Sequence, residues 1–313
     1  MRQRKHVGRI SRAAVGLIVA AWLLIHESAC DQLPCIFSTT CTKTIPTPRK
    51  IVLVIEENHA QSRIIGNPDA PYINRLATEG ALFTQSYAVT HPSQPNYIAL
   101  YSGSTQGVLN NSAWPHALFT APNLGSKLLA AGRTFIGYSD GLPEVGSDVE
   151  SAGNETDGYY RRKHNPWVNW QDAAVPTPPN KLPPSVNRPF TDFPTDFSQL
   201  PDLCVVVPNQ KHDMHDGTIA EGDAWLERNL GPYIEWAKTN DSLFILTFDE
   251  DDGLEFNRIP TIFVGPMVVP NEYRGAINHY NVLRTLEAMH GLGQDGATLF
   301  AAPITGAMWR TSP

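Results

Sequence analysis

The sequence predicts an α/β protein in three layers, with a mostly parallel central sheet between two layers of helices. Three observations support this fold class. Short β-branched apolar runs alternate with segments of helical spacing. Several runs are apolar throughout, as expected for strands that are covered on both faces. Several of the helical segments begin with proline and end with glycine, which are common residues at the two ends of a helix.

Six apolar runs are predicted as strands, and six segments between them as helices. The strands are Ile51–Ile55, Leu82–Ala88, Thr134–Tyr138, Cys204–Val207, Leu243–Phe248 and Thr261–Val264. The helical segments are 70–80, 95–103, 122–132, 219–230, 232–238 and 280–291.

We expect residues 51–313 to form a single domain, interrupted by a long proline-rich loop at 140–201. Part of this loop, VPTPPNKLPPSVNRPFTDFP, cannot form a regular helix or a central strand, because proline lacks the backbone N–H that both need. A loop of this length in a compact domain is usually functional, so we expect it to cover one face of the sheet and to border the site.

The first thirty residues have the layout of a secretory signal peptide. Five basic residues precede a thirteen-residue apolar run, Ala13–Ile25, and small and polar residues follow. As a helix the run would rise about 20 Å, short of a bilayer core of about 30 Å. We therefore expect a secreted protein without a stable membrane span, with an uncleaved leader as an alternative tether. Residues 31–50, rich in threonine and proline, are predicted to be a linker.

The cysteines and the charge balance narrow the class further. Export permits a disulfide between Cys35 and Cys41, whereas Cys204 begins an apolar strand and is predicted to be a buried thiol. The net charge is −7, and the first fifty residues hold eight of the basic and two of the acidic side chains. The remainder thus carries 16 positive and 29 negative side chains, an excess that makes a nucleic-acid partner unlikely to be attracted.

Oxygen and imidazole side chains follow four of the predicted strands and open the last helix. In open α/β sheets, ligands bind at the carboxyl ends of the strands, so we expect these side chains to converge. Taken singly, each group has an ordinary alternative, such as a polar turn, a helix cap or a solvated acidic loop. The groups are EEN at 56–58, THPSQPNY at 90–97, PNQKHDMHDG at 208–217, DEDDG at 249–253 and NHYN at 278–281.

Two of these groups indicate specific chemistry. The acidic run Asp249–Asp252 would lose its mutual repulsion by holding a hard divalent cation, which prefers oxygen ligands. Ser93 lies between Pro92 and Pro95, next to a predicted helix N-terminus that favours an anion. Beside a cation, such a serine hydroxyl could attack phosphorus as a nucleophile.

Together the motifs resemble the phosphoesterase family of bacterial acid phosphatases and phospholipases C, within the alkaline phosphatase-like superfamily. The resemblance rests on EEN, THPSQPNY, YRRKHNPWVNW, HDMHDG with GDAWL, TFDEDDG and NHYNVL, and extends from about Ile51 into the C-terminal region. It is nearer to secreted acid phosphatases that act on phosphatidylinositol 3-phosphate. The resemblance implies an alkaline phosphatase-like fold and a phosphomonoester substrate, with a phosphoinositide headgroup as one candidate substrate.

The resemblance also assigns roles to individual residues. His215 would hold the phosphate or protonate the leaving group, as an imidazolium at acid pH, and His279 is similar to a late histidine of the superfamily. Because the pair after the strand Leu243–Phe248 is all carboxylate, calcium or magnesium is favoured, with zinc as an open alternative. The implied metal ligands are Glu57, Asn58, Asp249 and Glu250; the implied catalytic residues are Ser93, His215 and His279; and the implied substrate contacts are Asn58, Asn96, Lys163 and His164.

These assignments predict a metal-dependent phosphomonoesterase that works through a phosphoserine. Two alternatives stay open: a phosphodiesterase of the phospholipase C type, and a secreted protein that binds phosphate or metal without turnover. The sequence contains no CxPxR motif for formylglycine, which argues against a sulfatase. The prediction requires that Glu57, Ser93 and Asp249 lie close together in the folded chain.

Overall fold

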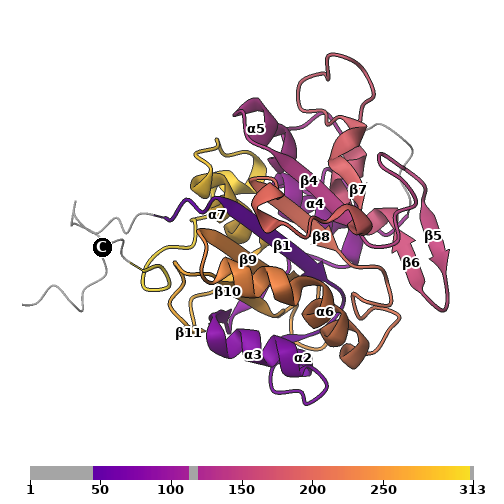
Figure 1. The fold of residues 1–313 in the computed structure, drawn as a ribbon. Coiled ribbons are helices and arrows are strands. Elements are labelled where there is room, and N and C mark those ends of the chain that lie inside the picture. Colours follow the sequence, from indigo (N-terminus) through magenta and orange to yellow (C-terminus); the bar gives the residue numbers. More distant parts are fainter. Residues whose placement is uncertain (1–44, 113–118, 311–313) are drawn as a thin grey trace, which may run out of the picture. The chain divides into compact units, whose positions relative to one another are not determined.

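An eight-stranded mixed sheet forms the centre of the computed structural model, which describes residues 45–112 and 119–310 (Figure 1). These residues belong to one unit, Lys43–Pro313. The leader, most of the linker, and Cys30, Cys35 and Cys41 lie outside the described residues. In order across the sheet, the strands are β11 (Asn271–Tyr273), β2 (Ala81–Phe83), β10 (Thr261–Val264), β9 (Ser242–Phe248), β1 (Lys50–Glu56), β8 (Leu203–Val207), β4 (Phe135–Ser139) and β7 (Asn187–Pro189).

Most neighbouring strands are parallel, as predicted. Strand β1 pairs in parallel with β8 on one side and with β9 on the other, and β4 pairs in parallel with β8 and β7. Strand β10 is the exception, because it runs antiparallel to both β9 and β2. The central strand β1 therefore has its carboxyl end beside those of β8 and β9, where polar side chains follow each strand.

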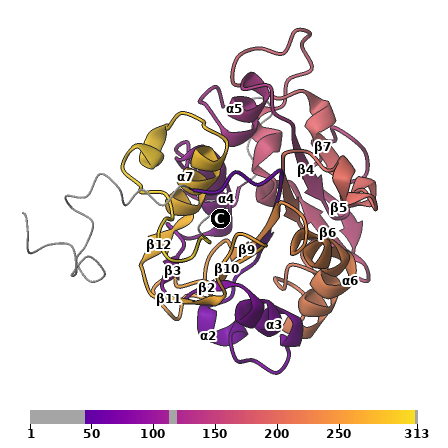
Figure 2. The ribbon, with the colours of Figure 1, turned by 60° about the vertical axis from the view of Figure 1, so that its left-hand side comes forward.

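The two faces of the sheet carry separate hydrophobic cores. Successive residues of a strand point to opposite faces, so Ile51 and Leu53 of β1 pack in one core, and Val52 and Val54 in the other. Figure 2 shows helices on both sides of the sheet, which gives the three-layer α/β/α arrangement. The first core is covered by α4 (Ser93–Ser102), α5 (Leu124–Ala130) and α7 (His279–Met289), and the second by α3 (Pro71–Glu79) and α6 (Ile219–Ala237), with the short α2 (Gln61–Ile64) beside it.

Two predicted elements differ from the structure in extent. The run Leu82–Ala88 is not one strand: β2 joins the main sheet, and β3 (Ser86–Tyr87) pairs in parallel with β12 (Ile277–Asn278) in a separate small sheet. The two helical segments at 219–230 and 232–238 form the single helix α6, with Pro232 inside it. Helix α6 begins with a capping box, in which Thr218 and Glu221 satisfy each other's backbone N–H groups.

The proline-rich segment at 140–201 contains short elements that its composition conceals. A two-stranded hairpin, β5 (Ser151–Asn154) and β6 (Gly158–Arg161), projects at the side of the molecule in Figure 1. Short 3₁₀ turns follow at Arg162–His164 and Pro166–Trp170, and Pro189 ends the edge strand β7. Proline is tolerated there because an edge strand leaves N–H positions unpaired.

Two tryptophans anchor this segment in the core under α4. Trp167 is fully buried and donates its indole N–H to the Asn187 side chain at 2.8 Å, and Trp170 donates to the carbonyl of Ala121 at 2.8 Å. The ring of Trp167 lies against the backbone of Gly137 in β4, where any Cβ atom would come within 2.1 Å of the indole. Removing a buried tryptophan side chain lowers the free energy of unfolding by roughly 3–5 kcal/mol. The two tryptophans therefore hold residues 162–166, which follow β6, in place.

Two further features of the described residues bear on the sequence predictions. Cys204 is a fully buried free thiol in β8, as predicted. No helix within residues 45–112 and 119–310 is both long enough and apolar enough to cross a bilayer.

Candidate active site

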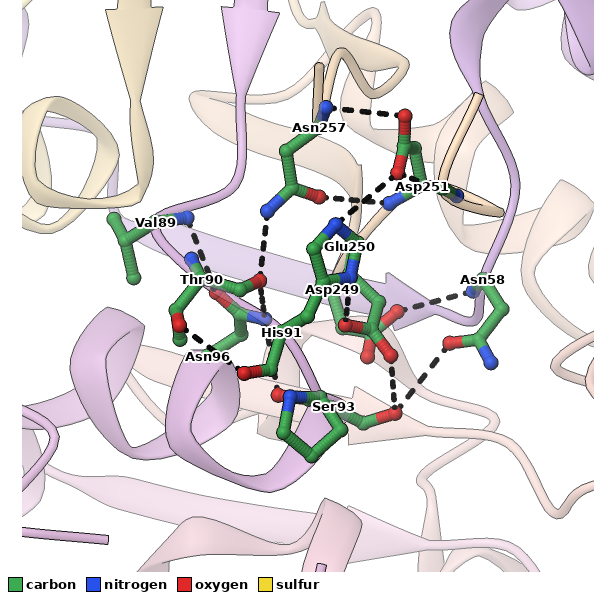
Figure 3. A network of polar contacts seen from close by, with 12 residues as sticks. Asn58, Val89, Thr90, His91, Ser93, Asn96, Asp249, Glu250, Asp251 and Asn257 are labelled. Atoms are coloured by element: carbon green, nitrogen blue, oxygen red, sulfur yellow. Dashed lines mark hydrogen bonds and ion pairs between the residues drawn. The ribbon is translucent and has the colours of Figure 1, made fainter. Parts of the chain in front are cut away.

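Ser93 is the first residue of α4 and lies buried beneath the carboxyl ends of β1 and β9 (Figure 3). Its hydroxyl oxygen is 3.1 Å from Glu57 Oε2 and 3.0 Å from Glu250 Oε1. The hydroxyl carries one proton and meets two carboxylates, so one of them can accept that proton while the other stays within reach. Helix α4 begins at Ser93 itself, with Pro92 as the N-cap residue. The Ser93 side chain faces the carboxylates and does not cap the helix.

The sheet register explains why these side chains meet. Glu56 of β1 pairs with Phe248 of β9, so the residues that follow, Glu57 and Asp249, leave the sheet side by side. The backbone N–H of Asn58 donates to Asp249 Oδ1 at 3.0 Å. Turned with its nitrogen towards the carboxylates, the Asn58 amide donates to Glu57 Oε2 at 2.9 Å and to Glu250 Oε1 at 3.2 Å. Glu57, Ser93 and Asp249 thus lie in one place.

A second set of side chains meets Glu57 from the other side and fits a metal ion. One ligand atom each of Glu57, His164 and Asp213 lies within 4.8 Å of the others, and all three residues are buried. His164 Nε2 is 3.1 Å from Glu57 Oε1, and its Nδ1 is 3.5 Å from Asp213 Oδ2. Glu57 Oε1, His164 Nε2, Asp213 Oδ2 and the nearby Asp249 Oδ2 are buried and form no hydrogen bond. Buried polar atoms without partners are rare, and a cation bound between Glu57, His164 and Asp213 would satisfy the atoms of these three residues.

The electrostatics lead to the same conclusion. Burial, and then Asp213, raise the pKa of Glu57 well above its usual value, while Lys163 acts in the opposite direction. Burial followed by the charges of Glu57 and Glu250 raises the pKa of Asp249 in the same way. Burial also raises the pKa of Asp213. Carboxyl groups this close, taken out of water, need protons or a positive ion to coexist.

His164, which the resemblance implied as a substrate contact, lies instead against the carboxylates of Glu57 and Asp213. Burial, and then the neighbouring basic groups of Lys163, His215 and Arg161, lower the pKa of His164 well below its usual value and so favour the neutral imidazole. A neutral imidazole nitrogen between two carboxylates is suited to coordinate a metal. The structure thus brings His164 and Asp213 to Glu57, where the sequence analysis placed Asn58, Asp249 and Glu250.

His215 lies near this group, in the loop after β8. Its ring centroid is 6.3 Å from that of His164, and its Nδ1 is 2.6 Å from Asp216 Oδ1. Its backbone N–H donates to Asp213 Oδ1 at 2.8 Å. The side chain is about 29% exposed, so a ligand in the site could reach it.

Two expected site residues hold the structure together instead of facing a ligand. The Asn96 amide accepts from the backbone N–H groups of Val89 and Thr90 and donates to the carbonyls of Thr90 and Pro92. All its polar atoms are engaged, so it braces the loop before α4 and leaves nothing for the phosphoryl contact we expected. His279 is buried behind β9, where its Nε2 donates to the Phe248 carbonyl at 3.0 Å. This bond holds the end of β9, directly before Asp249, while the Nδ1 of His279 is buried and forms no hydrogen bond with the described residues.

Lys163 lies next to His164, on the rim of a cavity that also contains Arg161 and Arg162. Its charge acts on Glu57 and His164 without a direct hydrogen bond. Lys163 and Gln94, the residue after Ser93, line the same cavity.

Asp213 and His91 were quoted in the sequence motifs but were given no role. His91 Nδ1 is 2.6 Å from Glu250 Oε2, and its Nε2 is 3.3 Å from Asp251 Oδ1, so it ties the loop before Ser93 to the acidic run. The signal for Asp213 was its place after a buried strand, but PNQKHDMHDG offers two aspartates and two histidines. Only the folded loop shows which of them faces Glu57.

The three-layer α/β architecture of the described residues is that of the alkaline phosphatase-like class of folds. A solved member of the alkaline phosphatase superfamily from Vibrio parahaemolyticus has the same fold, with a TM-score of 0.53 at 16% identity over 84% of this chain and 72% of that one. Within the class, residues 66–293 match the model of the phosphoesterase family, and the chain belongs to that family.

The sequence relatives are phosphatases. The chain is 46% identical to a phosphatidylinositol-3-phosphatase of Mycobacterium tuberculosis, over 94% of this chain and 92% of that protein. It is 32% identical to a phosphate-repressible acid phosphatase of Penicillium chrysogenum, over 70% of this chain and 54% of that one, so it spans about half the length of the fungal enzyme. The protein is thus a hydrolase of phosphoric ester bonds.

Proposed function

We propose that the protein is a secreted, metal-dependent phosphomonoesterase that forms a phosphoserine at Ser93. The observation that carries the proposal is the Ser93 hydroxyl, buried at the start of α4 and within 3.1 Å of carboxylate oxygens of Glu57 and Glu250. A serine in this position has acceptors for its proton and a helix N-terminus beside it for a phosphoryl group.

In the proposed reaction, Ser93 Oγ attacks phosphorus while its proton passes to Glu57 or Glu250. The bond from phosphorus to the leaving oxygen breaks, and the leaving alcohol takes a proton; we assign this donor role to His215, whose side chain is partly exposed beside the site. A water molecule then attacks the phosphoserine, which releases inorganic phosphate and restores the Ser93 hydroxyl.

The residues that would hold a metal ion are Glu57, Asp213 and His164, with Asp249 beside them. A bound divalent ion would supply positive charge for the phosphoryl oxygens and favour the serine alkoxide. Oxygen donors suit calcium and magnesium, which the sequence favoured, while the imidazole of His164 also suits zinc, the alternative left open by the sequence, and manganese. Activity after chelation, restored by each ion in turn, separates these candidates.

The substrate that we propose is a phosphoinositide with a 3-phosphate, in addition to simple phosphomonoesters. Support comes from the 46% identical phosphatidylinositol-3-phosphatase, which matches this chain over nearly its whole length. Phosphate release from phosphatidylinositol 3-phosphate and from p-nitrophenyl phosphate tests the proposal, with bis-p-nitrophenyl phosphate as the diester comparison. Preference for the diester would favour a phospholipase C type of activity instead.

The intermediate has its own test. Acid quenching during turnover, followed by mass spectrometry of the peptide that contains Ser93, is expected to find one added phosphoryl group. The Ser93→Ala variant should show none. Unmodified peptide at every quench time during steady turnover would contradict the phosphoserine mechanism.

Export remains part of the proposal, on the strength of the leader at 1–30. Expression of the full chain, followed by N-terminal sequencing of protein recovered from the culture medium, is expected to show loss of the apolar run Ala13–Ile25. Protein found only inside the cell, with an intact leader, would overturn this part.

A further inference from the structure

A basic cavity of about 230 Å³ opens beside Ser93. Three consecutive cations line it, at the end of β6 and in the 3₁₀ turn that follows. Gln94, Gln210 and one acidic residue, Glu150, complete most of the wall. The cations are Arg161, Arg162 and Lys163. Three positive side chains around one cavity are unexpected in a protein whose net charge is −7.

The cavity shares two walls with the active site. Gln94 follows Ser93 in α4, and Lys163 precedes His164, which contacts Glu57. On the opposite side, Gln210 Nε2 is 3.4 Å from His215 Nδ1. A molecule whose scissile phosphate lies at Ser93 would therefore extend its remaining part into this cavity.

Arg161 is held in position before any ligand arrives. Its Nε donates to Gln210 Oε1, its Nη1 donates to Ser151 Oγ at 3.0 Å, and its guanidinium lies over the Tyr159 ring at 4.9 Å. Nη2 makes no hydrogen bond to the described residues. A guanidinium that is fixed by two bonds and a ring loses little conformational entropy when it binds an anion.

Arg162 has an unused donor at the same cavity. The residue is only 4% exposed, and its Nη1 donates to Asn169 Oδ1 at 3.0 Å. Its Nε is buried and has no acceptor. Asp148 and Glu150 act on the charge of Arg162. A buried guanidinium N–H without an acceptor, in a residue that lines a cavity together with Arg161 and Lys163, indicates a binding site for an anion.

We propose that this cavity is a subsite for a second phosphate group on the substrate, so that the enzyme prefers phosphomonoesters that carry another phosphate nearby. This inference rests on the proposed phosphatase function and extends it to the class of substrate. Arg161 is the main ligand of the second phosphate, because a guanidinium binds phosphate oxygens through paired N–H groups. Inositol bisphosphates and the headgroup of phosphatidylinositol 3-phosphate both have this chemistry.

The kinetic test compares three substrates. The first, p-nitrophenyl phosphate, has one phosphate; the second, inositol 1,3-bisphosphate, has two; and the third, dibutanoyl phosphatidylinositol 3-phosphate, has a phosphodiester with a lipid tail in addition to its 3-phosphate. Arg161→Met is expected to lower kcat/KM for inositol 1,3-bisphosphate, relative to kcat/KM for p-nitrophenyl phosphate, by at least about tenfold. The loss should appear mainly in KM. Arg161→Lys keeps the positive charge but lacks the paired N–H groups of a guanidinium. Its kcat/KM ratio should lie between those of Arg161→Met and the wild type.

Arg228→Met is the matched control, because Arg228 is an exposed arginine on α6, in the layer on the other face of the sheet. It should leave the substrate ratio within about twofold. If Arg161→Met and Arg228→Met give the same ratio, the subsite does not exist. An equal loss on inositol 1,3-bisphosphate and on the phosphatidylinositol 3-phosphate assigns the second phosphate alone, whereas a larger loss on the phosphatidylinositol 3-phosphate assigns an added contact to the rest of its headgroup. A loss confined to the phosphatidylinositol 3-phosphate contradicts a subsite for a second phosphate.

A binding measurement separates this inference from the proposed function. Calorimetric titration of the Ser93→Ala protein with inositol 1,3-bisphosphate requires no turnover. Adding Arg161→Met should raise Kd by at least about tenfold, whereas adding Arg228→Met should not. Unchanged Kd in both double variants refutes the subsite even if the wild type is an active phosphatase; a wild type that hydrolyses no phosphomonoester refutes the function even if the titration shows the Arg161 effect.

Discussion

The buried carboxylates of this protein are of two kinds, which look alike in the sequence and differ in their hydrogen-bond partners. In the loop after β9, the Asp251 carboxylate accepts from the backbone N–H groups of Gly253, Glu255 and Asn257. Two residues earlier, Asp249 has one oxygen on the Asn58 N–H and the other on nothing. Both side chains are buried, but only one is satisfied by the protein.

The same contrast separates other buried acids. Asp223 of α6 accepts from the backbone N–H groups of Tyr72 and Ile73 and so completes the start of α3. Glu57 and Asp213 instead leave an oxygen without a partner, next to His164. Acids that bind backbone N–H groups build the fold, whereas buried acids left incomplete are available for a ligand. Burial alone does not distinguish the two.

The largest expected effect is on kcat, when the hydroxyl of Ser93 is removed. Ser93→Ala should lower kcat for p-nitrophenyl phosphate by at least about 10³-fold, because the nucleophile is lost. Thermal unfolding should stay close to that of the wild type. Ser102→Ala, on the same helix with its hydroxyl bonded to the Ile98 carbonyl, is the control and should keep nearly full activity. Comparable activity in the two variants would remove Ser93 from the mechanism.

Next in size is the effect on metal binding. His164→Asn removes one ligand of the trio and should weaken the affinity of the metal-free protein for zinc or manganese by at least about tenfold, as measured by calorimetric titration. His212→Asn is matched to it, since His212 bonds Asp140 outside the trio. Equal metal affinity of both variants would show that the incomplete atoms at Glu57 are not a metal site.

The two regions of the acidic run should respond to the same change with opposite signs in stability. Asp251→Asn loses charge-assisted bonds to three N–H groups and should lower the free energy of unfolding by about 2 kcal/mol. Asp249→Asn relieves repulsion with Glu57 and keeps an acceptor for the Asn58 N–H. In EDTA it should unfold no more easily, or be stabilised by about 1 kcal/mol, while activity is lost. Urea unfolding of both variants measures the difference; two equal losses would erase the distinction.

A smaller effect concerns pH. Burial lowers the pKa of His279 to about 4, with the hydrogen bond to the Phe248 carbonyl acting against it. The unfolded chain binds this proton near pH 6.5, so the stability that His279 contributes is complete above about 6.5 and declines as the pH falls towards about 4. Between pH 7 and pH 5 the loss should be about 2 kcal/mol.

His279→Gln tests this assignment, because its amide can still donate to the Phe248 carbonyl. Urea unfolding at a series of pH values should show a shallower decline for the variant on acidification. Parallel curves for wild type and variant would mean that another group causes the acid sensitivity.

The sequence was informative where a local rule decides the outcome. Apolar runs such as Ile51–Ile55 and Leu243–Phe248 have nowhere to lie except between two layers, so the parallel core of the sheet could be predicted. The proline-rich segment at 140–201 could not, because its hairpin and edge strand have neither periodicity nor apolar alternation. Its place depends on Trp167 and Trp170 reaching the core under α4.

For the candidate site, the sequence by itself determined which loops carry the chemistry, because the carboxyl ends of parallel strands must share one edge of the sheet. Which side chains within those loops face one another was decided only by the tertiary structure. Asn96 bonds to backbone groups of its own loop, whereas His164 contacts Glu57. Both are polar residues in motifs that resemble those of the family. The reason is that local sequence sets strand ends, whereas hydrogen-bond partners and burial arise from segments more than a hundred residues apart, such as Glu57 and Asp213.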